Sequence, residues 1–374
     1  MKINLDDCGL HLRFAPLTLT RPIGNIRIGI LTNDERWIKF LPEAEIGFIT
    51  EDYLSKKFKA LEDGIRVNAA VVPNEDMVAA IVHLEENTAL YWNDLFLASN
   101  GSELYKVQFT GNEPIILSQR WHVFQKNGVV LALDFALVTA GRKSQKLSNT
   151  NTLIGSLNEI FLEEGAIVEA SILNTTTGPI YVGKDAEIME GSVVRGGLAL
   201  NENATLKLSS KVYGPCTLGP HCKVGGEINN VTFQAYSNKG HDGFLGNASI
   251  GEWCNLGADT NSSNLKNNYG NVSTYSYESN AEIKTDTQFM GVCMGDHSKC
   301  SINSMFNTAT VVGVSCNIFG TDFPPKFIPS FSWGGSGGFV KFKLEKAIEY
   351  SNNMMNRRGL NLSPEEVEIF EYLV

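Results

Sequence analysis

Residues 182–224 read VGKDAEIMEGSVVRGGLALNENATLKLSSKVYGPCTLGPHCKV, and this stretch decides the fold. A valine, isoleucine or leucine stands at every sixth position of it, and a glycine follows several of them. At 43% hydrophobic content, such a run arises by chance on the order of once in a thousand starting points. The six-spaced residues are Val182, Ile188, Val194, Leu200, Leu206, Val212, Leu218 and Val224. The spacing resumes at Ile250 and Leu256, and again from Met294 to Ile318.

A period of six fits neither an α-helix nor an alternating strand. It fits a solenoid whose triangular coil has three six-residue sides, with the aliphatic residues directed into a shared core and glycines at the corners. We therefore predict a left-handed parallel β-helix of hexapeptide repeats; a β-sandwich is the alternative, and the return of the register after each interruption disfavours it. The interruptions at 228–248 and 259–293 are expected to be loops that leave the coil. Such prisms usually pair as trimers with ligands between subunits, so we expect a homotrimer.

Composition excludes several classes of protein. With 374 residues and 19% charged residues, the chain is neither disordered nor of low complexity. The formal net charge is −10 and no basic tract exceeds two residues, which disfavours a nucleic-acid partner. No apolar run reaches the roughly 18 residues of a membrane span. The seven cysteines include no Cys-x-x-Cys pair and no signal peptide is evident, which favours reduced thiols and a cytoplasmic location.

The first 150 residues lack the six-residue repeat and have a different sequence pattern. Helix-like segments at 34–40 and 76–85 alternate with apolar runs at 69–72, 89–97 and 129–139, which we interpret as strands of an α/β sheet. Arg13, Arg21 and Arg27 are candidate phosphate ligands, because guanidinium groups match phosphate oxygens. Asp94 ends the strand-like run 90–93, where the sugar-phosphate nucleotidyltransferases that the segment Arg13–Pro22 resembles place a magnesium-binding aspartate, and Asp134 is a second candidate metal ligand for a phosphoryl-type transfer. A helix N-cap for Asp94 and a satisfied polar group in a strand for Asp134 are equally acceptable readings.

The segment Gly225–Gly270 resembles the acetyltransferase half of the GlmU family of bifunctional N-acetylglucosamine-1-phosphate uridyltransferases. The matching residues are Lys239-Gly240-His241, Leu245-Gly246-Asn247, Ile250-Gly251, Asn255 and Asn264, in register without gaps from Glu227. The resemblance implies that His241 is the general base of acetyl transfer, a role that suits an imidazole with an ordinary pKa of about 6.5. It also implies that Lys239 meets the phosphate of the sugar, and that Glu227, Asn255 and Asn264 belong to the sugar site. Asn229 and Phe244 stand where the family has a lysine and a tyrosine of the acceptor site.

The segment Arg13–Pro22, RFAPLTLTRP, resembles the triphosphate-binding segment of sugar-phosphate nucleotidyltransferases. Asp6-Asp7-Cys8-Gly9 replaces the glycine-rich loop of those enzymes, and Ile23 replaces a lysine. Together with Leu17–Thr32 and Gly320–Gly335, this segment makes nearly the whole chain similar to divergent GlmU-family proteins, in which a shortened nucleotidyltransferase-like domain precedes a β-helix.

The sequence therefore predicts an α/β nucleotidyltransferase-like domain over residues 1–148, a left-handed β-helix over 150–334 and a helical tail over 339–374. A helix over Lys343–Arg358 ends at Gly359, and a second begins at Ser363-Pro364; this tail is expected to cap the end of the β-helix or to clasp a neighbouring subunit.

The resemblance implies acetyl-CoA-dependent N-acetylation of glucosamine 1-phosphate, and Mg²⁺-dependent uridylyl transfer from UTP that gives UDP-N-acetylglucosamine. Sugar phosphate and nucleoside triphosphate would be the small-molecule partners. Three alternatives remain: a nucleotidyltransferase for another sugar with a structural β-helix, an acetyltransferase whose first domain only binds nucleotide, and a non-catalytic trimeric scaffold that binds a sugar nucleotide.

Overall fold

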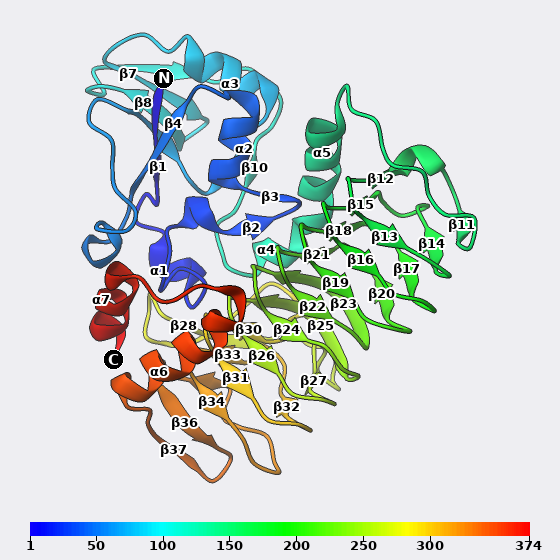
Figure 1. Ribbon diagram of the computed structural model, residues 1–374. Helices are drawn as coiled ribbons and strands as arrows, with labels where there is room; N and C mark the ends of the chain where they lie inside the picture. The colour runs from blue at the N-terminus through cyan, green and yellow to red at the C-terminus, as the bar shows by residue number, and fades with distance from the viewer.

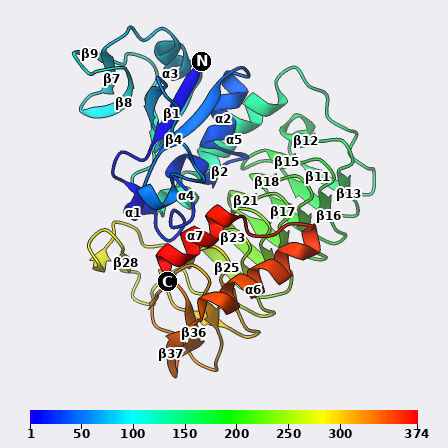
Figure 2. The same cartoon turned by 60° about the vertical axis from the view of Figure 1, so that its left-hand side comes forward.

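The computed structural model describes all 374 residues and shows an α/β domain, a parallel β-helix and two C-terminal helices (Figure 1). The fold class expected from the sequence is confirmed. The α/β domain lies along the side of the β-helix, and the tail runs back between them (Figure 2).

The N-terminal domain is built on a mixed sheet of order β4-β1-β5-β8-β7-β9. Strand β1 is parallel to β4 and β5, and β8 is antiparallel to β5 and β7. The sheet strands are β1 (Lys2–Asp6), β4 (Glu45–Ile49), β5 (Ile65–Asn68), β7 (Thr88–Trp92), β8 (Leu95–Asn100) and β9 (Tyr105–Gln108). Two short pairs are β2 (Arg27–Ile28) with β3 (Leu31–Thr32), and β6 (Val71–Val72) with β10 (Ile115–Ile116). The helices are α1 (His11–Phe14), α2 (Asn33–Phe40), α3 (Glu75–Val82), α4 (His122–Gln125) and α5 (Asn127–Thr139).

One expectation for this domain is wrong: the apolar run at 129–139 is not a strand but part of helix α5. Its buried residues include Val130, Leu131, Asp134 and Val138, spaced as one face of a helix, whereas Val129 and Leu133 are exposed. The expected helices at 34–40 and 76–85 correspond to α2 and α3.

The β-helix has three flat faces, which the chain visits in the order face 1, face 2, face 3. Face 1 consists of β11 (Thr152–Ile154), β14 (Ile172–Asn174), β17 (Val193–Arg195), β20 (Lys211–Tyr213), β27 (Asn261–Ser262) and β32 (Met305–Phe306). Face 2 consists of β12 (Ile160–Leu162), β15 (Ile180–Val182), β18 (Leu198–Leu200), β21 (Cys216–Leu218), β30 (Cys293–Met294), β33 (Val311–Val312) and β35 (Phe327–Ile328). The long strands β23 (Glu227–Phe233) and β25 (Phe244–Ile250) span faces 1 and 2.

Face 3 carries the residues of the site described below. It consists of β13 (Ile167–Val168), β16 (Glu187–Ile188), β19 (Thr205–Leu206), β22 (Lys223–Val224), β24 (Asn238–Lys239), β26 (Asn255–Leu256), β31 (Lys299–Cys300), β34 (Asn317–Ile318) and β36 (Ser332–Gly335). Strand β37 (Gly338–Lys341) folds back on β36 at the end of this sheet.

The six-spaced aliphatic residues form the core of the β-helix, as predicted. All eight residues from Val182 to Val224 are at most 1% exposed and belong to one continuous cluster, which removes their side chains from water turn after turn. The interruption at 228–248 does not leave the coil, contrary to expectation, because β23, β24 and β25 continue the turns there. The interruption at 259–293 leaves the coil after β27 and forms the hairpin β28 (Ser273–Ser276) and β29 (Ala281–Lys284).

We expected glycine at the corners of the coil for its conformational freedom, and the structure shows a different role. Gly183 does not have a positive φ; a Cβ there would lie 2.7 Å from the backbone carbon of Asn201 in the next turn. The left-handed position comes two residues later and is occupied by Asp185 and, one turn on, by Asn203. Glycine at 183 is therefore required by the close stacking of turns, while the side chain at the left-handed position remains free to vary.

The N-terminal domain covers the outer side of face 2. The outward residues there are small and buried, namely Ala199, Thr217, Thr232 and Ser249. The Thr217 hydroxyl donates to the carbonyl of Gly29 at 2.7 Å, and Ala199 packs with residues of α5 and β3. The small side chains allow the α/β domain to lie directly on the sheet.

The C-terminal tail straps the two domains together. Helix α6 (Leu344–Met355) passes into a 3-10 turn (Asn356–Arg358), and Gly359, with φ of 71°, ends it. Helix α7 (Pro364–Leu373) begins with a capping box between Ser363 and Glu366, as the sequence predicted. Tyr372 then stacks on Tyr53 of the N-terminal domain at 4.1 Å between ring centroids. The tail is thus a clasp within the chain, lying along the side of the β-helix.

Candidate active site on face 3

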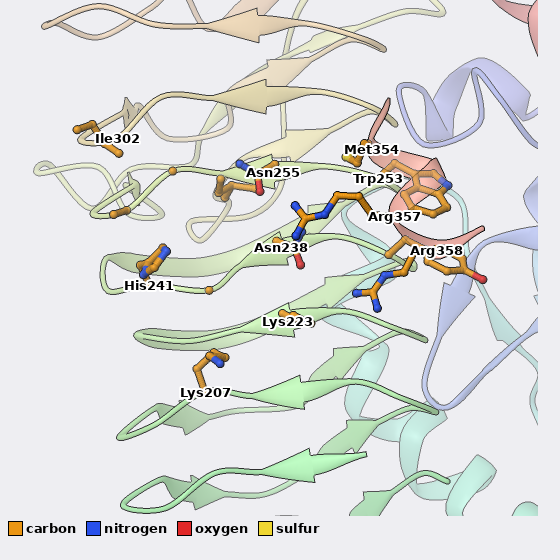
Figure 3. Close-up of a pocket in the computed structure, with 15 residues that line it drawn as sticks. Lys207, Lys223, Asn238, His241, Trp253, Asn255, Ile302, Met354, Arg357 and Arg358 are labelled. Carbon is orange, nitrogen blue, oxygen red and sulfur yellow. The ribbon is translucent and has the colours of Figure 1, made fainter. Parts of the chain in front are cut away.

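The cavity that contains His241 lies between face 3 and the tail and has a volume of about 580 Å³ (Figure 3). Its polar lining consists of His241, two amides, one tyrosine and four cationic side chains, and no carboxylate lines it. Its cationic, imidazole and amide lining residues are Lys207, Lys223, Asn238, His241, Asn255, Arg357 and Arg358.

The strand register explains the order of the polar residues along face 3. Lys223, Asn238 and Asn255 are successive neighbours across β22, β24 and β26, and Lys299 follows on β31. Each of these four residues directly precedes an inward-facing position, so each points outward. His241 lies just after β24, at the corner where the chain turns from face 3 to face 1. The regular coil therefore holds His241 and Asn255 at one side of the same cavity.

The side chain of Lys239 is hydrogen-bonded to the backbone of the corner that carries His241. It is 1% exposed, and its ammonium donates to the carbonyls of Gly225 and His241, both at 3.0 Å. Burial lowers the pKa of Lys239 to about 8. The expected contact between Lys239 and a phosphate is not available in this arrangement, because the ammonium faces the interior and holds the backbone.

A stack of rings borders the cavity at the corner between faces 2 and 3. His221, Tyr236, Trp253 and His297 occupy the left-handed position of successive turns, with centroid separations of 4.8, 4.1 and 6.4 Å. Their faces cover one another, which leaves ring edges for contact with a ligand. Tyr236 and Trp253 line the cavity.

Two other expected sugar-site residues lie on face 1, outside this cavity. Asn264 donates from Nδ2 to Oδ1 of Asn247 at 2.8 Å. Glu227 accepts a hydrogen bond from the hydroxyl of Tyr213 at 2.7 Å and lies 3.8 Å from the ammonium of Lys211. The structure thus brings His241 together with Asn255 and separates them from Asn264 and Glu227.

The arginines expected to bind a triphosphate are occupied within the protein. Arg21 is buried and ion-paired with Asp296 and, at 2.7 Å, with Glu252 of the β-helix. These two carboxylates hold the pKa of Arg21 above its ordinary value, against the effect of burial.

The other two arginines of that group are also paired. Arg27 is paired with Glu35 at 2.9 Å, and the partly exposed Arg13 with Glu278 at 3.0 Å. The segment that resembles a triphosphate-binding motif therefore serves as an interface with the β-helix.

The two candidate metal ligands have different environments. Asp134 is 1% exposed, forms an ion pair with Arg36 at 2.7 Å and accepts from the backbone of Ile30 and Leu31. Both of its carboxylate oxygens accept hydrogen bonds within the protein, as in the alternative of a satisfied polar group, although the segment is a helix and not a strand. Asp94 lies exposed in the turn between β7 and β8, with no hydrogen bond or ion pair. No group of three or more His, Cys, Asp or Glu side chains is arranged to hold a metal ion.

Sequence reasoning missed the cations of the cavity. The position before each inward residue of face 3 could have indicated Lys223 and Asn238. No periodic signal marks Arg357 and Arg358, because the tail places them there only after folding. All seven cysteines are free, and no helix is long and apolar enough to cross a membrane.

One known family is similar to the first domain. Residues 3–143 match the family described as sugar nucleotidyl transferase. This match covers less than half of the chain and makes the N-terminal domain similar to that family. A comparison with curated proteins finds no match.

Several solved structures are similar to this chain over part of its length. The polysialic-acid-specific acetyltransferase NeuO is 10% identical with a TM-score of 0.31, over 52% of this chain and 87% of that one. A UDP-N-acetylglucosamine acyltransferase from Arabidopsis is 13% identical with a TM-score of 0.26, over 57% and 75%. The one from Campylobacter jejuni is 13% identical with a TM-score of 0.22, over 61% and 95%.

Proposed function

We propose that the protein is a bifunctional transferase of amino-sugar nucleotide synthesis. The cavity on face 3 transfers the acetyl group of acetyl-CoA to the amine of a hexosamine 1-phosphate, with glucosamine 1-phosphate as the first candidate. The N-terminal domain then transfers a uridylyl group from UTP to the product, which gives UDP-N-acetylglucosamine. The observation that carries the proposal is a single cavity in which a histidine and amides face a group of cations without any carboxylate.

The chemistry assigned to His241 follows from what the reaction requires. The sugar amine attacks the thioester carbonyl, a C–N bond forms, the C–S bond breaks and CoA leaves with the electron pair. The amine must lose a proton during this attack, and the imidazole of His241 takes it. Asn255 holds the sugar by hydrogen bonds, and Lys239 positions His241 through its carbonyl.

The proposed nucleotidyl transfer is supported by the similarity of the N-terminal domain to the sugar nucleotidyl transferase family. Strand β7 is antiparallel to β8, which is antiparallel to β5, and β5 is parallel to β1, so β7 runs in the same direction as β1. The turn after β7, which carries Asp94, therefore lies at the carboxyl edge of the parallel strands. One or two carboxylates typically hold Mg²⁺ beside substrate phosphates. Asp94 is exposed and free to serve as such a ligand, whereas Asp134 is paired with Arg36. When bound, Mg²⁺ would neutralise charge that develops on the phosphates.

A second candidate is an acetyltransferase whose N-terminal domain binds nucleotide without turning it over. The pairing of Arg13, Arg21 and Arg27 with carboxylates favours it, because the arginines expected to bind a triphosphate are then occupied within the protein.

Replacement of His241 tests the acetyl transfer. His241→Ala should lower the rate of CoA release with glucosamine 1-phosphate by roughly 10²–10⁴-fold, the usual size of a general-base contribution. The fold should survive, because His241 is exposed and outside the core of the β-helix. A variant that keeps nearly the full rate would remove His241 from the mechanism.

Replacement of Asp94 tests the nucleotidyl transfer. Asp94→Ala should abolish pyrophosphate release from UTP and leave acetyl transfer intact, since the two sites are separate and their effects should add. If the wild-type protein acetylates but releases no pyrophosphate, the second candidate replaces the first.

A further inference from the structure

The two tail arginines differ from nearly all other arginines of the protein. Every arginine except Arg195, Arg357 and Arg358 donates to a carboxylate or a backbone carbonyl. Arg357 and Arg358 form no ion pair or hydrogen bond and point toward the cavity from the turn after α6 (Figure 3). Their charges are therefore not neutralised within the chain.

Two lysines of the coil face the same space. Lys223 lies on β22 and pairs with Thr205 of the neighbouring strand β19. Lys207 is the first residue after β19. Neither side chain has a hydrogen bond or an ion pair with the protein, and the cavity has no acidic lining residue. Partial burial lowers the pKa of Lys223, and the nearby Arg358, Lys207 and Arg357 lower it further.

This cluster is unfavourable for the empty protein. Like charges repel one another, and the repulsion is stronger where water is partly displaced. The chain has 41 Asp and Glu residues against 31 Lys and Arg residues, yet none of these carboxylates lines the cavity. A bound anion would offset the repulsion. Guanidinium groups bind phosphate oxygens through two parallel hydrogen bonds, and lysines add point charges, so a phosphate ester suits the four groups together.

We propose that Arg357, Arg358, Lys207 and Lys223 form a subsite for a phosphate ester, supplied jointly by the tail and the coil. The inference rests on the proposed acetyl transfer and deepens it by naming the residues that select a phosphorylated acceptor. Arg357 extends between Asn238 and Asn255 in Figure 3, with His241 at the far side of the cavity. A sugar phosphate in this cavity would place its phosphate at the arginines and its amine toward His241.

Direct binding tests the subsite without any catalysis. Titration calorimetry would measure inorganic phosphate, pyrophosphate and glucosamine 1-phosphate with the full chain and with R357Q/R358Q. The double variant should bind roughly 10- to 100-fold more weakly, as expected for loss of hydrogen bonds to a charged group. R195Q is the matched control, because Arg195 is another arginine without a partner, located on face 1. Unchanged binding in R357Q/R358Q, or an equal loss in R195Q, would overturn the proposal.

Steady-state kinetics distinguish the two sources of phosphate. If the subsite holds the acceptor, R357Q/R358Q raises KM for glucosamine 1-phosphate, leaves KM for acetyl-CoA unchanged and does not affect glucosamine as a substrate. A rise only in KM for acetyl-CoA would assign the same phosphate subsite to the donor and overturn the acceptor assignment. If the wild-type protein binds phosphate through these arginines but never transfers acetyl, the subsite stands and the proposed function fails.

Discussion

At the residue scale, the structure uses most of its buried charges to hold segments together. Arg36 and Asp134 are both nearly inaccessible to solvent and join α2 to α5 across 98 residues of sequence. Removing one partner of such a pair leaves an uncompensated buried charge, which costs far more than the pair contributes. The pairing therefore explains why Asp134 is unavailable to a metal ion.

Asp134→Asn should lower the free energy of unfolding by about 3–5 kcal/mol, because Arg36 remains buried without its counter-charge. Urea unfolding followed by circular dichroism measures the change. Glu113→Gln, at an exposed position without partners, is the control and should shift little. A metal role for Asp134 would be supported instead by normal stability combined with lost Mg²⁺ dependence.

Lys299 leads to a prediction about pH. Its ammonium donates to the carbonyl of His297 at 2.9 Å, and burial lowers its pKa from the ordinary value of 10.5 to about 8. The folded state therefore holds this proton less tightly than the unfolded state. The resulting cost to stability is present in full below pH 8 and disappears as the pH rises toward 10.5.

The variant Lys299→Met isolates this effect. Between about pH 7 and about pH 9.5, wild-type protein should gain stability relative to Lys299→Met, because only the wild type can release the proton. Urea midpoints of both proteins across this range measure the difference and cancel the other titrating groups. Parallel curves for the two proteins would contradict the assignment.

At the scale of elements, one aromatic side chain of the tail packs where several parts of the chain meet. Phe370 of α7 is 2% exposed, and its ring lies 5.5 Å from Phe331 and 5.2 Å from His297, edge to face. It shares a small core with Ala15 and Leu19 of the first domain. Three parts of the chain therefore meet at Phe370.

Phe370→Ala should lower stability by about 3–5 kcal/mol and release the tail, because it leaves a cavity at this junction. Urea unfolding and limited proteolysis after residue 343 measure the two effects. Leu360→Ala, at a 40% exposed position, should change neither. Helix α7 also forms ion pairs between Glu368 and Lys56 at 2.5 Å and between Glu366 and Lys57 at 2.7 Å. Retention of the protease pattern and stability in Phe370→Ala would show that these ion pairs hold the tail without the aromatic contact.

At the scale of the molecule, only one face of the β-helix remains open along most of its length. The N-terminal domain covers face 2, and the tail lies along face 3 (Figure 2). Face 1 exposes Ile172 and the neighbouring Val193, at 40% and 43%. Apolar side chains in register on an open sheet face favour association.

We predict a homotrimer that forms through the β-helices and uses face 1. Light scattering at micromolar concentration should give three times the chain mass of 41.0 kDa. Val193→Glu should weaken the assembly, since it places a charge in the contact. A monomeric wild-type protein would exclude the trimer, and with it any ligand site between subunits.

Local patterns were sufficient wherever each residue's environment repeats or depends on its sequence neighbours. The six-residue period predicted the core because every turn of the coil buries the same position. Gly359 and Ser363 predicted the limits of the tail helices because caps act within one helical turn. The same reasoning failed for α5, where an apolar run alone does not distinguish a strand from a buried helix.

The sequence by itself determined the β-helix and the tail helices. It predicted His241 in a loop that leaves the coil, whereas the structure places this residue at a corner of the coil, in the same cavity as Asn255. Only the tertiary structure decided which cations are free. Arg21 finds Asp296 at a separation of 275 residues, while Arg357 and Arg358 reach the cavity of His241 without a carboxylate partner. Charge pairing depends on distance in space, and a short-range pattern contains no information about which distant groups the fold brings together.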